Sequence, residues 1–215
     1  MKNTRLLLAS MIAAALAAAP VWSAALTTPG DYAITGTTSA ASPQLAGVVL
    51  ADTTTSFTVV GAAGSLSGTV QSRVLRSTLD GTLDFYWRIT PTSGSDGIAA
   101  FRLIGFDGVD LNADWRSDGQ GSVAPTTARY LGSGAVNFLF ENDKVGVGSG
   151  SYFFFLDTDA TNFTQNGQFD LLYGDNLDLS DIYQTYAPAA VPVPATAWLL
   201  GSGVIGLVGL RRRRC

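Results

Sequence analysis

The oxygen-bearing side chains between residues 110 and 121 have the spacing of a calcium-binding loop. Four residues would supply positions one, three, five and nine of such a loop: Asp110, Asn112, Asp114 and Asp118. The sequence departs from the pattern twice, because Trp115 replaces the glycine that turns the chain and Gly121 replaces the bidentate glutamate. Calcium is the only cofactor that the sequence indicates, and a solvated acidic turn is the alternative interpretation.

Two further acidic groups favour turns rather than a site. The first contains Asp175, Asp178 and Asp181, which alternate with leucines and indicate an exposed strand or turn. The second follows an aromatic run and contains Asp157, Asp159 and Asn162, residue types that form turns. A carboxyl pair at a fixed separation can hydrolyse a glycoside, but nothing in the sequence places two carboxylates together.

The residue types exclude most other catalytic chemistry. The chain has no histidine, and its only cysteine is Cys215, so it lacks a Ser-His-Asp triad, and the segment before residue 215 lacks a thiol nucleophile and a zinc site of imidazole or thiolate ligands. We therefore predict a non-catalytic protein, with a cation-dependent hydrolase of a surface polymer as the less favoured alternative. Aromatic side chains on a β face, such as Tyr86, Trp115 or Tyr130, could stack on sugars, which keeps carbohydrate binding open.

The N-terminus has the pattern of a signal peptide. Lys2 and Arg5 form a basic start, an apolar stretch runs over residues 6–19, and Ser23 and Ala25 are the small residues that a signal peptidase requires. We expect cleavage after Ala25, so that residues 1–25 are removed.

The C-terminus has the pattern of a transmembrane helix with a basic end. Residues 195–210 carry no charge and would form a helix roughly 24 Å long, slightly shorter than a usual span. Trp198 suits the headgroup region, and the four arginines Arg211, Arg212, Arg213 and Arg214 are expected on the cytoplasmic side.

Removal of both ends changes the charge of the protein. The chain has 13 basic and 17 acidic residues, but only 7 of the basic ones lie between the two terminal segments, which leaves a net charge of about −10. A nucleic-acid partner is excluded, because phosphate binding needs clustered lysine or arginine.

The segment in between has the period-two pattern of β-strands. In residues 81–90, Leu83, Phe85, Trp87 and Ile89 fall on one face and polar residues fall on the other, which predicts a half-buried strand. Similar runs cover residues 44–50, 56–60, 65–76, 98–106, 135–140, 151–156 and 168–173. Asp-Gly pairs at residues 80, 96, 107 and 118 divide them. We predict an all-β fold, an antiparallel β-sandwich or jelly roll, over residues 26–186. An Ala/Pro stem over 187–194 and the transmembrane helix with its tail over 195–215 follow it.

The C-terminal segment resembles a known sorting signal. It resembles the PEP-CTERM signal of Gram-negative bacteria, with Val-Pro-x-Pro-Ala in place of Pro-Glu-Pro, in residues Val191, Pro192, Pro194, Ala195, Trp198 and Arg211 to Arg214. The preceding segment is similar to a recurrent passenger type of that family, over residues 66–70, 81–86, 123–128 and 161–164. This resemblance implies export through the inner membrane to the cell surface or extracellular space, with signal peptidase and an exosortase as processing partners. It also implies a structural or adhesive role linked to exopolysaccharide and biofilm. Carbohydrate binding is the more specific version of that role.

Overall fold

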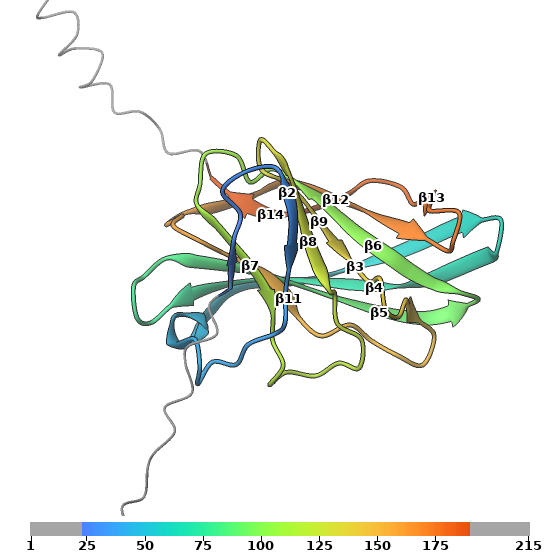
Figure 1. The fold of residues 1–215 in the computed structure, drawn as a ribbon, viewed down its shortest axis with the longest axis horizontal. Coiled ribbons are helices and arrows are strands. Elements are labelled where there is room, and N and C mark those ends of the chain that lie inside the picture. The colour runs from blue at the N-terminus through green and yellow to red at the C-terminus, as the bar shows by residue number, and fades with distance from the viewer. Residues whose placement is uncertain (1–22, 190–215) are drawn as a thin grey trace, which may run out of the picture.

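Residues 23–189 form two antiparallel β-sheets that pack face to face as a sandwich, as the computed structural model shows (Figure 1). The all-β sandwich predicted from the sequence is therefore confirmed. Most of the predicted signal peptide, the sorting motif, the transmembrane helix and the terminal arginines lie outside the described residues. Within residues 23–189, no helix has the length and apolar character needed to cross a membrane.

Each sheet has a continuous order of hydrogen-bonded strands. Sheet A has the order β1 (Ala24–Ala25), β7 (Leu111–Trp115), β11 (Phe154–Thr158), β5 (Leu83–Gly94), β4 (Gly64–Ser77) and β3 (Gly47–Gly61). Sheet B has the order β13 (Asp178–Leu179), β12 (Phe163–Tyr173), β6 (Gly97–Ile104), β9 (Ala135–Leu139), β8 (Thr127–Gly132) and β2 (Gly30–Ala33). Two short strands join sheet B at its side, β10 (Val145–Gly146) on β6 and β14 (Tyr183–Pro188) on β12.

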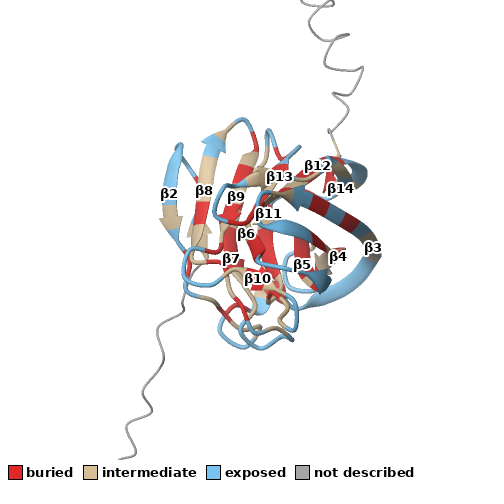
Figure 2. Cartoon of the chain, turned by 90° about the vertical axis from the view of Figure 1, so that its right-hand side faces the viewer, coloured by how far each residue is buried: buried red, intermediate tan, exposed pale blue. Residues whose placement is uncertain are grey.

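The core between the sheets is dominated by aromatic side chains. Trp87 lies with its ring centroid 5.8 Å from that of Phe101 and 6.2 Å from that of Phe154, and Phe101 stacks on Phe169 of sheet B at 4.9 Å. The Trp87 indole donates a hydrogen bond of 2.8 Å to the Thr185 hydroxyl, so the one polar atom of this buried ring is paired. Figure 2 shows the buried residues concentrated between the two sheets.

In strand β5, the prediction is confirmed for the residues that face the core and is wrong for two residues on the opposite face. Leu83, Phe85, Trp87 and Ile89 face the core and are buried, as the alternation predicts. Asp84 and Tyr86 on the opposite face are buried as well, although the pattern predicts a solvated face. The cause is a segment that covers this face and contains the 3-10 helix η1 (Pro43–Leu45).

Two element boundaries differ from the predicted ones. The strand predicted over residues 44–50 begins only at Gly47, because Pro43 and Leu45 belong to η1 and Leu45 packs onto the outer face of sheet A. At the other end, β14 includes Ala187 and Pro188, which composition alone assigned to the stem. A proline is tolerated there because β14 is an edge strand.

Candidate functional site

The outer face of sheet A presents its side chains in transverse rows, because antiparallel register places paired residues on the same face. The first row pairs Gln71 with Arg88 across β4 and β5. The second row crosses four strands and contains Arg73, Tyr86, Phe155 and Asp114. The third row also crosses four strands and contains Leu75, Asp84, Asp157 and Asn112. Basic, aromatic and acidic groups thus follow one another along this face.

Residues 36–46, which we call the strap, cross over the second and third rows. Leu45 is only 1% exposed and forms a small hydrophobic cluster with Tyr86 and Phe155, separate from the core between the sheets. Burial of this leucine holds the strap against the sheet.

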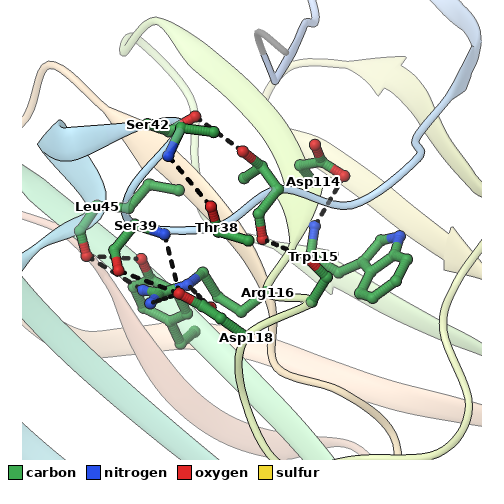
Figure 3. Close-up of polar contacts among 12 residues, drawn as sticks. Thr38, Ser39, Ser42, Leu45, Asp114, Trp115, Arg116 and Asp118 are labelled. Carbon is green, nitrogen blue, oxygen red and sulfur yellow. Dashed lines mark hydrogen bonds and ion pairs between the residues drawn. The ribbon is translucent and has the colours of Figure 1, made fainter. Parts of the chain in front are cut away.

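Hydrogen bonds to β7 and the turn after it fix the strap in place (Figure 3). The Arg116 guanidinium donates to the Leu45 carbonyl at 3.2 Å. The Ser39 amide and hydroxyl both donate to Asp118 Oδ2, each at 3.0 Å. At the start of the strap, the Gly36 amide donates to Asp114 Oδ1 at 2.8 Å. Both carboxylates therefore serve as acceptors for the strap backbone.

A pocket of about 500 Å³, which we call the arginine pocket, opens beside the strap. Its lining comprises Gln71, Arg73, Leu75, Tyr86, Arg88, Arg116, Gly119, Gln120 and Phe153. Three of the 7 basic residues between the predicted terminal segments thus meet in one pocket of a strongly acidic domain.

The three guanidinium groups differ in how their charge is balanced. Arg73 pairs with Asp52 at 2.7 Å and lies over the Phe153 ring, 4.9 Å from its centroid. Arg116 pairs with Asp118 at 2.7 Å, and this contact holds the pKa of the Asp118 carboxyl well below its usual range.

Arg88 forms no ion pair with any residue that the structure describes. Its Nε donates to the Ser151 carbonyl at 3.3 Å and its Nη1 to the Gln120 side-chain oxygen at 3.2 Å. These neutral acceptors orient the guanidinium but do not cancel its charge, so the pocket keeps a positive centre.

The lining contains groups that can bind both anions and hydroxyl groups. Guanidinium groups bind carboxylate, sulfate or phosphate by paired hydrogen bonds, and the carboxamides of Gln71 and Gln120 suit hydroxyls. Burial, and then the charge of Asp84, raises the pKa of the Tyr86 hydroxyl above its ordinary value, so this group stays protonated at neutral pH.

The third row contains a pair of carboxyl groups that the sequence did not reveal. Asp84 on β5 pairs in register with Asp157 on β11, and Asp84 is 0% exposed. Burial, and then the charge of Asp157, raises the pKa of Asp84 to about 9, and burial also raises the pKa of Asp157. The two residues are 73 positions apart in the chain, so only the pairing of β5 with β11 brings them together.

The four residues of the predicted calcium loop do not surround a common point. Residues 111–115 form the extended strand β7, whereas a calcium loop must wrap around its ion. Asp114 and Asp118 accept the hydrogen bonds of the strap, and Asp110 is exposed. Among residues 23–189, no group of three or more His, Cys, Asp or Glu side chains could hold a metal ion. Calcium at Asp110, Asn112, Asp114 and Asp118 stays a prediction without a geometric basis.

The other predicted turns and stacking residues have structural partners. Asp175 pairs with Lys144 at 2.8 Å, and Asp178 accepts the Ala62 amide at the β3–β4 turn. The three aromatic residues expected to stack on sugars are in fact buried or packed against other side chains: Tyr86, Trp115 and Tyr130. Of these three, only Tyr86 lines the arginine pocket, where Phe153 is the second aromatic ring and lies under Arg73.

Of the predicted signal-cleavage residues, Ala25 lies in β1, where it pairs with Asn112, and Ser23 directly precedes that strand. Cleavage after Ala25 would thus remove β1 and leave Leu26, whose amide donates to the Leu111 carbonyl at 2.8 Å.

No protein-family model matches this chain, and it matches neither a curated protein nor a solved structure.

Proposed function

We propose that this chain is an exported, non-catalytic protein of the cell surface or extracellular matrix, whose sandwich binds an anionic polysaccharide in the arginine pocket. The observation that carries the proposal is that Arg73, Arg88 and Arg116 line one pocket together with Phe153. The resemblance of the two termini to a signal peptide and an exosortase sorting signal supports export to the cell surface, and the same resemblance implies an association with exopolysaccharide.

The charge of the pocket selects for acidic sugars over neutral ones. A uronic acid unit carries a carboxylate for the unpaired guanidinium of Arg88 and hydroxyls for Gln71 and Gln120. The acidic remainder of the domain repels a polyanion, but at physiological ionic strength this repulsion is screened beyond about 8 Å, whereas contacts inside the pocket are not. A volume of about 500 Å³ also falls within the usual range of ligand sites.

The test measures binding of the purified protein to polygalacturonate and to neutral dextran by calorimetry. Arg88→Gln removes the unpaired charge and should weaken polygalacturonate binding about tenfold or more. Arg129→Gln is the matched control, because it makes the same change of charge on β8 of sheet B, where Arg129 pairs with Asp31. It should leave the affinity within about twofold, since exposed ion pairs contribute little.

Two outcomes would contradict the binding proposal: equal affinity for dextran and polygalacturonate, or an equal loss in both variants. Thermal unfolding of each variant shows that the fold is retained. Export and removal of the sorting signal are tested separately, by intact-mass measurement of the protein recovered from medium and from membranes. A native product that still contains Trp198 to Arg214 would replace the sorting proposal by a retained membrane anchor.

A further inference from the structure

The carboxyl pair in the third row is the least compensated group in the described part of the molecule. Asp84 is fully buried, and neither of its carboxyl oxygens accepts a hydrogen bond from an N–H or a hydroxyl group. The one side-chain hydrogen bond that acts on Asp84 is with the facing Asp157 carboxyl. Buried polar groups with so few partners are rare in folded proteins, since each costs the free energy of its lost hydration. A further partner would therefore stabilise this pair.

The neighbouring side chains do not supply a positive charge. Asp157 lies opposite Asp84 on β11, and Asp80 adds further negative charge nearby. The charge of Arg116 acts on Asp84, but this guanidinium is already engaged by Asp118 and by the Leu45 carbonyl. The two facing carboxyl groups thus have no basic side chain of their own.

Two side-chain amides that could serve as metal ligands lie near Asp84 and Asp157. Asn112 on β7 is in register with Asp157 and lies on the same face of the sheet. The side-chain amide of Gln44 in the strap donates to the Asp157 carboxylate, and rotation of this amide by half a turn would present its oxygen instead. Side chains in register on neighbouring strands are about 4.5–5.5 Å apart at Cβ, so the carboxylates of both aspartates can reach one ion between them.

We propose that Asp84 and Asp157, together with the amide oxygens of Asn112 and Gln44, bind a calcium ion beneath the strap. Calcium takes oxygen ligands at about 2.3–2.6 Å and tolerates irregular geometry. Two carboxylates balance its charge, and the two amides and water complete the shell. This site differs from the loop suggested by the sequence, with which it shares only Asn112.

The experiment titrates the chelated, purified protein with calcium chloride and measures the midpoint of thermal unfolding. A ligand that binds only the native state raises that midpoint, so millimolar calcium should shift it upward by several degrees. Terbium is the second probe, because it replaces calcium and should emit light when Tyr86, which follows Asp84 on the same face, is excited.

Asp84→Asn and Asp157→Asn should each abolish both signals, since each removes one of the two charges. Asp110→Asn is the matched control, because this exposed residue belongs to the predicted loop but not to the proposed site, and it should keep both signals. Absence of a shift and of terbium emission in the parent protein would overturn the proposal. So would a calcium shift that persists in Asp84→Asn, since the ion would then bind elsewhere. The polygalacturonate assay measures binding in the arginine pocket, so failure of the calcium test leaves the proposed saccharide binding intact.

Discussion

Replacement of Leu45 by alanine tests whether the strap is part of the folded structure. The change removes three carbon atoms from a side chain that is 1% exposed. At about 0.8 kcal/mol for each buried methylene, the transfer term is about 2.4 kcal/mol, and the cavity left behind adds to it. Leu45 belongs to a small cluster with Tyr86 and Phe155, whose side chains can partly close the gap. We therefore expect a loss of about 3 kcal/mol, in the lower half of the range for buried leucines.

The assay is urea unfolding at pH 7, with Leu79→Ala as the matched control. Leu79 is 68% exposed on the turn between β4 and β5, so the same deletion should change the free energy of unfolding by less than about 0.5 kcal/mol. Hydrogen exchange should also accelerate at the Ala46 amide, which donates to the Pro43 carbonyl within the strap. A loss below about 1 kcal/mol in Leu45→Ala, or equal losses in both variants, would refute the packing of the strap on sheet A.

Three further predictions concern the core, the turns and the carboxyl pair. Thr185→Val leaves the Trp87 indole without its acceptor and should cost about 1–3 kcal/mol in urea unfolding, while a wild-type value would show that another acceptor replaces the hydroxyl. Gly94→Ala should cost about 3 kcal/mol or more, because a Cβ there would meet the backbone of β4 and φ is +124°. Gly81→Ala, with φ at +79° and open space around it, should cost only about 1–2 kcal/mol, and equal costs would contradict the clash. In chelator, stability should fall as pH rises from about 4 to 9, because native Asp84, with its pKa raised to about 9, holds a proton that the unfolded chain releases. Asp84→Asn should flatten this dependence, and an unchanged slope would contradict it.

The core of the sandwich could be predicted from the sequence because it depends on local alternation. Leu83, Phe85, Trp87 and Ile89 recur at period two, and a strand places such residues on one face whatever its neighbours are. The Asp-Gly pairs were likewise sufficient to locate turns, since glycine and aspartate tolerate positive φ; Asp96 has a φ of 53°.

The outer face could not be predicted because it depends on register and on the strap. Alternation shows that Arg73 and Arg88 point away from the core, but only the pairing of β4 with β5, Arg73 opposite Tyr86 and Gln71 opposite Arg88, makes them diagonal neighbours in one pocket. The strap could not be recognised in the sequence, because Leu45 there continues the apolar run of β3. In the structure, Leu45 packs on the outer face of sheet A instead. A proline two residues before the first apolar residue of such a run, as Pro43 stands before Leu45, is the signal that indicates a separate turn.

The strap joins the two proposed sites, and this connection has a thermodynamic consequence. The carbonyl of Leu45 accepts a hydrogen bond from Arg116, which lines the arginine pocket, while the preceding Gln44 lies beside Asp157. A calcium ion that binds Gln44 restricts the strap and thereby the position of the Arg116 guanidinium. An anion that draws Arg116 away from the Leu45 carbonyl loosens the same segment and weakens the hold on the ion. Linkage is reciprocal, so any effect of calcium on the affinity for an acidic saccharide must equal the effect of that saccharide on the affinity for calcium.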